Sequence, residues 1–401
     1  MSTKELEQYS QDRPLLLLTD FAPSMGGGGA VILRSLLRER DRERMVWGSP
    51  LLAPGDDGAS AGTLPLRTPA GRLRRWLGRR SLTVDSLFSG AIADDVATSA
   101  RNLNARAIWI VMHGAMVHVA ARLSERTDLP VHLSVHDDPP YGVGLMTRRH
   151  LGLIPLVARD LGLALRRARS IDVISAGMAR RYETRYGAKS VVVHRGMEGP
   201  VNSSPPYDPE RGLQIGVLGN PYSYRQLFML VDAVARAAST IGTRGRLLII
   251  GQGPGARVRE YARGQVDVEV TGHLGEPAAI ERLKSCFLLY LNYPFSIRAA
   301  VLRQTSFPTK LSTYVMAARP LLQHAPPDSS VADLSSLTDY VAPWGDERIE
   351  TGVESIVRAW NDQDLHQCRD FQAEVVRRRY YDLETNRATL FRALNALVVP
   401  S

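Results

Sequence analysis

Short apolar runs alternate along this chain with segments in which apolar residues recur every three or four positions. Runs with the length of buried parallel strands lie at 15–18, 107–112, 131–135, 213–218, 246–250 and 287–291. Segments with helical spacing follow several of them, for example at 115–124 and 151–169. Strands that alternate with helices in this order predict an α/β protein with parallel sheets.

A turn-rich stretch divides this pattern into two halves. Residues 198–206 read EGPVNSSPP and lack apolar periodicity, which is typical of a linker. A chain of 401 residues is also longer than one compact core usually holds. We therefore expect an N-terminal domain over 1–205 and a C-terminal domain over 206–381.

The composition narrows the class of protein. Hydrophobic residues make up 44% and charged residues 23% of the chain, and no run approaches the roughly 18 apolar residues of a membrane span. The N-terminus is polar, without the apolar core of a signal peptide, and two distant cysteines give neither a disulfide framework nor metal-ligand spacing. These features favour a cytoplasmic protein. The net charge of +9 predicts an acidic partner. This partner is a nucleic acid, an anionic membrane surface or a phosphorylated substrate.

Four consecutive glycines follow the first predicted strand, at 26–29. A strand, a glycine loop and a helix in this order let the backbone approach a phosphate or a sugar closely. We place Gly27 and Gly28 on the acceptor or sugar side of a binding site. A merely flexible turn is the alternative, because the spacing does not match the dinucleotide-binding fingerprint.

Polar residues directly follow two further strands of the first domain. His113 comes after 107–112, and His136 and Asp137 come after 131–135. In an open α/β sheet the residues just beyond the carboxyl ends of the strands line the ligand crevice. These three are therefore candidates for the acceptor or sugar side, and the alternative for each histidine is a structural role.

The segment 306–322 of the second domain contains the clearest candidate for an anion site. It predicts a short helix that begins near Lys310, which is one of only four lysines among the 50 basic residues. Unpaired N–H groups at a helix N-terminus and a compact cation suit a phosphate. Arg225 lies near the start of another helix, against the preference of the helix dipole, which also points to an anion. An ordinary surface lysine is the alternative for Lys310.

Several motifs of the C-terminal half resemble one family. They are Gly251-Gln252-Gly253-Pro254 followed by Val270-Thr271-Gly272, and Phe307-Pro308-Thr309-Lys310-Leu311 followed by Tyr314 and Arg319-Pro320. They are similar to those of family 4 of the retaining glycosyltransferases, the glycosyl transferases group 1. The resemblance implies the GT-B fold, in which two Rossmann-like α/β domains face each other across a cleft. It also implies that a C-terminal helix at 382–398 packs back on the first domain.

The resemblance implies a transferase of EC 2.4 type. Such an enzyme moves a sugar from a nucleotide-sugar to the hydroxyl of a glycan, a lipid-linked glycan or a natural product, with retention and without a metal. Arg225 and Lys310 would stabilise the leaving diphosphate, and His136 would orient the sugar or the acceptor. No cofactor is expected, because the nucleotide-sugar is a co-substrate. The implied donor-binding residues are Gly219, Tyr224, Gly251, Gly253, His273, Pro308, Thr309, Leu311 and Thr313.

The sequence departs from the family at two positions. The family usually has two glutamates eight positions apart, and Thr305 and Thr313 occupy these places. The second glutamate normally accepts hydrogen bonds from the ribose, and a neutral hydroxyl binds more weakly than a carboxylate. Another residue then supplies the contact, or the donor is unusual, or the site is weak or dead. A non-catalytic or weakly active sugar- or nucleotide-binding partner subunit and a sugar-nucleotide epimerase are therefore alternatives.

A basic segment bears on the acceptor. Residues 72–80, from Arg72 to Arg80, carry five arginines around Leu73, Trp76 and Leu77, which share a helix face. A peripheral contact with an anionic membrane surface and packing on the protein's own domain are both compatible with this pattern. Nucleic acid is not expected as a partner, because the arginines lack the interleaved aromatics of a single-strand platform.

Overall fold

The computed structural model describes residues 13–21, 28–49, 63–64, 81–114, 116–146, 152–251, 253 and 255–396. It divides into two compact units. Unit 1 comprises Met1–Gly196 and Leu383–Ser401, and unit 2 comprises Met197–Asp382. The boundary between Gly196 and Met197 lies before the boundary at 205/206 that the linker composition predicts. The basic segment 72–80 and Gly27 lie outside the described residues.

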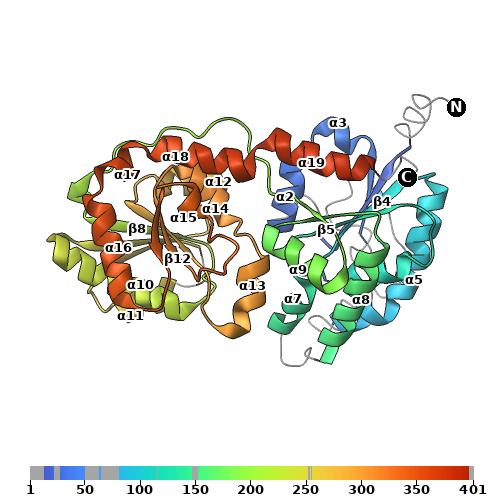
Figure 1. Ribbon diagram of the computed structural model, residues 1–401, viewed down its shortest axis with the longest axis horizontal. Helices are drawn as coiled ribbons and strands as arrows, with labels where there is room; N and C mark the ends of the chain where they lie inside the picture. Colours follow the sequence, from blue (N-terminus) through green and yellow to red (C-terminus); the bar gives the residue numbers. More distant parts are fainter. Residues whose placement is uncertain are drawn as a thin grey trace. The chain divides into compact units, whose positions relative to one another are not determined.

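The described residues of unit 1 form a seven-stranded parallel sheet (Figure 1). In spatial order its strands are β3 (Thr63–Leu64), β2 (Met45–Gly48), β1 (Leu15–Leu18), β4 (Ala107–Val111), β5 (Val131–Val135), β6 (Ser170–Val173) and β7 (Val191–Val192). Every residue of β1, β4 and β5 is buried, as a sheet covered by helices on both faces requires.

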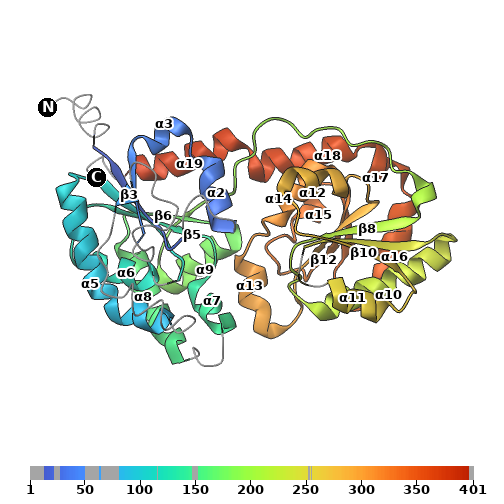
Figure 2. The ribbon, with the colours of Figure 1, turned by 180° about the vertical axis from the view of Figure 1, so that it is seen from behind.

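Helices cover both faces of this sheet because the chain reverses direction across it. They are α2 (Gly28–Leu36), α3 (Glu39–Arg42), α5 (Ser81–Asn102), α6 (Met116–Leu123), α7 (Pro139–Met146), α8 (Ile154–Arg167), α9 (Ala176–Tyr186) and α19 (Leu383–Asn395). The connection from β1 to β2 runs one way along the sheet and that from β4 to β5 the other, so right-handed crossovers place α2 and α6 on opposite faces. Figure 2 shows α5, α6 and α8 on one side and α2 with α19 on the other.

The last helix of the chain is joined to unit 1 by several polar contacts. The backbone N–H of His194 donates to Asn386 Oδ1 at 2.8 Å, and Arg387 Nη1 lies 2.8 Å from Asp41 Oδ2. The Ser170 hydroxyl donates to the carbonyl of Ala393 at 3.0 Å. Although α19 lies at the other end of the sequence, it completes the helical layer that begins with α2.

In unit 2 the part of the chain that the structure describes forms a six-stranded parallel sheet. In spatial order its strands are β10 (Asp267–Gly272), β9 (Gly245–Ile250), β8 (Leu213–Leu218), β11 (Leu288–Asn292), β12 (Leu321–His324) and β13 (Val341–Trp344). The chain again reverses direction in the middle of the sheet, between β8 and β11. Ligands of open α/β sheets bind beyond the carboxyl ends of the strands at such a switch point.

Two helical layers enclose the sheet of unit 2 (Figures 1 and 2). The helices are α10 (Tyr224–Ile241), α11 (Gly255–Ala262), α12 (Glu276–Leu283), α13 (Ala300–Thr305), α14 (Lys310–Ala317), α15 (Leu334–Leu337), α16 (Ile349–Asn361), α17 (Gln363–Gln367) and α18 (Arg369–Val376). One layer packs α10 against α11 and α16, and the other packs α12 against α14. These two parallel sheets with helices confirm the α/β fold class. No helix of the described residues is long and apolar enough to cross a membrane.

Candidate functional site

Glycine loops at the carboxyl edge of the unit 2 sheet lie against one another. The N–H of Gly219, after β8, donates to the Ile250 carbonyl at 2.7 Å, and the N–H of Gly251, after β9, donates to the Gly272 carbonyl at 2.8 Å. Gly251 has φ 140°, and a Cβ there would lie 3.4 Å from the Gly219 Cα. A Cβ on Gly253 would lie only 2.6 Å from Asn220 Oδ1. The position of Gly251 favours glycine because L side chains rarely adopt its φ, and Gly253 leaves room for the side chain of Asn220.

Lys310 begins α14 beside these loops. Its Nζ lies 3.4 Å from the carbonyl oxygen of Asn220 and 5.2 Å from the ring centroid of Tyr222. No carboxylate of the described residues forms an ion pair with it, and loss of solvent lowers the pKa of its ammonium to about 8. A desolvated cation without an anionic partner is stabilised by an anion that binds next to it.

Arg225 lies in the first turn of α10, also next to the Gly219 loop. Its Nη1 is 3.4 Å from Glu347 Oε1, and 72% of its side chain is exposed. An ion pair this exposed is weak, so the guanidinium can reorient toward a ligand at little cost. The neighbouring Tyr224 hydroxyl donates to the Gly253 carbonyl at 3.5 Å. The structure therefore gathers Lys310, Tyr224, Gly219 and Gly253 around one loop, with Arg225 at its edge.

The two threonines in the glutamate positions have different environments. Thr305 is buried, and its hydroxyl donates to the Val301 carbonyl of its own helix at 2.6 Å. The Thr313 hydroxyl donates instead to Glu276 Oε1 at 3.0 Å. Glu276 is the first residue of α12 and is half-buried. A carboxylate thus lies beside position 313, although a different helix carries it.

Among the other residues of the predicted donor site, some are buried and shape the backbone, and others are exposed. Leu311 is fully buried, and its N–H donates to the carbonyl of the buried Pro308 at 3.0 Å, which shapes the loop before α14. Thr309 and His273 are exposed. Tyr314 accepts from the Leu218 N–H at 2.9 Å and donates to the Tyr290 carbonyl at 3.0 Å, so it ties α14 to the ends of β8 and β11.

A second group of polar residues lies at the carboxyl edge of the unit 1 sheet. His113 Nδ1 is 2.7 Å from Asp20 Oδ2, and Asp20 follows β1, the neighbour of β4. The His113 side chain is 55% exposed and the Asp20 side chain 10%. The hydrogen bond with Asp20 raises the pKa of His113. A Cβ on Gly114 would lie 2.5 Å from Asp20 Oδ2, so this turn is built around the pair.

His136 lies at the end of the next strand and faces the start of α2. A Cβ on Gly29 would lie 3.3 Å from its Nδ1 and 3.1 Å from Phe21 Cζ. This Nδ1 is buried and has no hydrogen-bond partner within the part of the chain that the structure describes. Burial lowers the pKa of His136, so the ring is neutral at physiological pH. Asp137 is exposed, and Gly28 is the first residue of α2.

Sequence reasoning missed three carboxylates of these sites. Asp20 follows the first strand as the two histidines follow later strands, so the same strand-end criterion could have found it. For Glu276 the only indication in the sequence is its position at the start of the helix that follows β10. Asp138 is buried and accepts from the Tyr141 N–H at 3.1 Å, which caps α7. No group of three or more His, Cys, Asp or Glu side chains suited to a metal ion occurs among the described residues.

Comparisons with known proteins identify the fold. No protein-family model and no curated protein matches the chain. Solved structures of GT-B glycosyltransferases match it over nearly its whole length, so the fold is GT-B.

Three of these structures illustrate the match. Sucrose-phosphate synthase from Thermosynechococcus elongatus superposes with a TM-score of 0.68 at 14% identity, over 96% of this chain and 99% of its own. Anabaena HepE, in complex with UDP and glucose, gives 0.62 at 15% identity over the same shares. The lipopolysaccharide outer core galactosyltransferase WaaB, in its apo form, gives 0.64 at 12% identity over 96% and 99%. Identities this low establish the fold alone.

Proposed function

We propose that the protein is a glycosyltransferase that uses a nucleotide-sugar donor and transfers the sugar to an acceptor hydroxyl. The observation that carries this proposal is Lys310, a half-buried ammonium with a lowered pKa that lies at a helix start beside glycine loops, in a GT-B fold. A diphosphate leaving group gains negative charge as the glycosidic bond breaks, and a cation fixed in a site of low polarity stabilises that charge. Arg225 would add a second, mobile positive charge.

The ribose of the donor is proposed to bind at Thr313 and Glu276. The resemblance to family 4 predicts a carboxylate at position 313, and the hydrogen bond between Thr313 and Glu276 puts one beside that position. A carboxylate can accept two ribose hydroxyls in charge-assisted hydrogen bonds, which are stronger than those that a neutral threonine hydroxyl accepts. Because α12 provides this carboxylate, we favour a functional donor site over one that has lost its activity.

The acceptor is proposed to bind at the carboxyl edge of the unit 1 sheet. There His113, oriented by Asp20, keeps Nε2 for an acceptor hydroxyl, and His136 offers an orienting contact for a sugar. The resemblance supports retention and catalysis without a metal, and both belong to the proposal. So do a cytoplasmic location and a glycan, lipid-linked or natural-product acceptor; a peripheral membrane contact through 72–80 would favour the lipid-linked one.

The test is donor binding and turnover by wild type, Lys310→Met and Lys189→Met. Lys189 is an exposed lysine of unit 1 and serves as the matched control. We expect UDP-, GDP- or TDP-sugars to raise the melting temperature of wild type and Lys189→Met. Lys310→Met should bind about ten- to a hundredfold more weakly, the worth of a charge-assisted hydrogen bond. If no nucleotide or nucleotide-sugar binds wild type, or if Lys310→Met binds as tightly, the proposal is wrong.

A further inference from the structure

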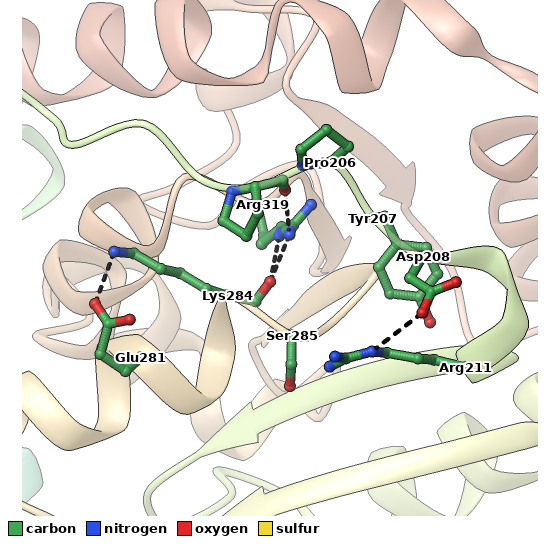
Figure 3. Close-up of a pocket in the computed structure, with 9 residues that line it drawn as sticks. Pro206, Tyr207, Asp208, Arg211, Glu281, Lys284, Ser285 and Arg319 are labelled. Carbon is green, nitrogen blue, oxygen red and sulfur yellow. Dashed lines mark hydrogen bonds and ion pairs between the residues drawn. The ribbon is translucent and has the colours of Figure 1, made fainter.

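A cavity of about 330 Å³ lies at the opposite edge of the unit 2 sheet from the glycine loops. Its walls include Tyr207 and Arg211 just before β8, Lys284 and Ser285 before β11, and Arg319 before β12 (Figure 3). These are the amino ends of three neighbouring parallel strands. The six residues of β8 span about 20 Å, so this cavity is separate from the proposed donor site.

Arg319 supplies the unusual feature of this cavity. It is 1% exposed, its Nε donates to the Lys284 carbonyl at 2.8 Å, and its Nη2 donates to the Pro205 carbonyl at 2.7 Å. Its Nη1 is buried and has no hydrogen-bond partner in the described parts of the chain, and Figure 3 shows this nitrogen without a contact among the lining residues. The guanidinium therefore keeps a free donor toward the space between Pro206 and Tyr207.

Arg319 also lacks a carboxylate partner among the described residues, although its guanidinium lies 5.9 Å from the ring centroid of Tyr207. The other charged residues of the cavity pair among themselves: Lys284 Nζ lies 2.7 Å from Glu281 Oε1, and Arg211 Nε lies 3.6 Å from Asp208 Oδ2. No carboxylate of the described residues forms an ion pair with Arg319. Burial, and next the charge of Arg369, lower the pKa of Arg319 to about 10. A buried cation without a counter-charge destabilises the fold, and a bound anion would relieve this cost.

We propose that this cavity binds a small oxoanion, namely a phosphate group, with Arg319 as its main ligand. A guanidinium with a free N–H matches the geometry of a phosphate oxygen, and Arg211 and Lys284 add positive charge around it. The volume is at the lower limit of ligand pockets, so it suits inorganic phosphate or the phosphoryl end of a small metabolite, and not a nucleotide-sugar. The inference does not depend on the proposed function.

The experiment measures phosphate binding by calorimetry and by melting temperature. The probes are inorganic phosphate and glucose 6-phosphate, and the proteins are wild type, Arg319→Met, the double variant Arg211→Gln/Lys284→Met and Lys310→Met. We expect phosphate to raise the melting temperature of wild type and of Lys310→Met equally. Arg319→Met should lose the shift. The double variant keeps the Arg319 contacts and should bind at least fivefold more weakly, which tests the cavity even if Arg319→Met does not fold.

The outcomes separate the possible sources of the signal. Tighter binding of glucose 6-phosphate than of phosphate supports a phosphorylated metabolite, and equal or weaker binding supports free phosphate. Loss of the shift in Lys310→Met, with retention in the double variant, would place the phosphate at the donor site and overturn the inference. Absence of any shift in wild type with both probes would overturn it as well. Neither result bears on whether nucleotide-sugars bind.

Discussion

The hydroxyl of Thr313 donates a hydrogen bond to the carboxylate of Glu276 at 3.0 Å. The two residues come from neighbouring helices of unit 2, α14 and α12, which pack side by side. Comparison of the sequence with family 4 at position 313 alone indicates only that a threonine replaces the usual glutamate. The structure shows that the first residue of α12 carries a carboxyl group beside this position.

This relationship predicts that Glu276 contributes to recognition of the donor ribose. Glu276→Gln should weaken UDP binding about two- to thirtyfold, because a charged acceptor contributes about 1.5–3 kcal/mol against about 1 kcal/mol for a neutral one. Wild type should also prefer UDP to 2′-deoxy-UDP or 3′-deoxy-UDP, and the variant should lose most of that preference. Calorimetric titration of the nucleotides measures both effects.

Glu269→Gln is the matched control for this prediction. Glu269 is half-exposed on β10 and pairs with Arg282. It should bind UDP as wild type does. If Glu276→Gln bound UDP and its deoxy analogues with unchanged affinity, the ribose would not bind at Thr313 and Glu276.

The strands of the protein could be predicted from sequence because they are apolar and buried. The predicted runs 131–135 and 213–218 coincide with β5 and β8, whose residues are almost all buried. The four-residue β2 was missed, because it is only partly buried and follows a charged segment. Its apolar run is too short and too mixed to stand out.

The pairings within the candidate sites could not be predicted in the same way. Glu276 and Thr313 are 37 positions apart, and Asp20 and His113 are 93 apart. No periodicity of the sequence links such residues, because the packing of helices and the order of strands bring them together. The strand-end criterion did select His113, but its partner required the knowledge that β1 and β4 are neighbours. The roles of these residues stay predictions.

A second prediction concerns the pair of His113 and Asp20. Because the pKa of His113 is raised in the folded protein, the pair stabilises the fold below the ordinary pKa of histidine. This contribution disappears as the pH rises through the raised pKa. Asp20→Asn should therefore destabilise the protein more at pH 5.5 than at pH 8.5, by about 0.2–1 kcal/mol, the range for a solvent-screened pair.

Two measurements check this prediction. Urea denaturation at the two pH values gives the stability difference, and NMR titration of the His113 ring should show a lower pKa in Asp20→Asn than in wild type. The variant Asp137→Asn, at an exposed neighbour, is the control and should shift the pKa less. An unchanged His113 pKa in Asp20→Asn would contradict the pairing.

A third prediction concerns a buried polar network on β5 and β6. His132 Nε2 lies 2.7 Å from Asp172 Oδ1, which also accepts from the Ser134 hydroxyl, and both side chains are almost fully buried. Removing the carboxylate leaves Nε2 of His132 and the Ser134 hydroxyl without this partner in a buried position, although His132 Nδ1 keeps its hydrogen bond with Ser170. Asp172→Ala should lower the free energy of unfolding by about 3–5 kcal/mol, as loss of one member of a buried pair does.

The control for this network is an exposed aspartate. Asp94 pairs with Arg126 at 2.6 Å, and 65% of its side chain is exposed. Asp94→Ala should cost about 1 kcal/mol or less. Equal losses of stability in the two variants, measured by urea denaturation at pH 7, would mean that the network contributes no more than a surface pair.

A fourth prediction separates stability from binding at Lys310. Burial lowers the pKa of Lys310 from 10.5 to about 8, so the folded protein holds its charge at a cost at neutral pH. Between about pH 8 and 10.5 the unfolded chain binds more protons than the folded one, and stability from this group rises with pH. Lys310→Met should therefore stabilise the ligand-free protein at pH 7, by an amount on the order of 1–3 kcal/mol.

The same substitution should weaken nucleotide binding, because the methionine removes the charge that a diphosphate would neutralise. Its stabilising effect should shrink at pH 10, where the lysine is largely neutral in the folded state. Thermal denaturation of wild type, Lys310→Met and Lys189→Met at the two pH values, without ligand, measures this effect. If Lys310 served only in packing, Lys310→Met would not raise the stability of the ligand-free protein. A gain in stability coupled to a loss of donor affinity would mark Lys310 as a residue maintained at a cost to the fold.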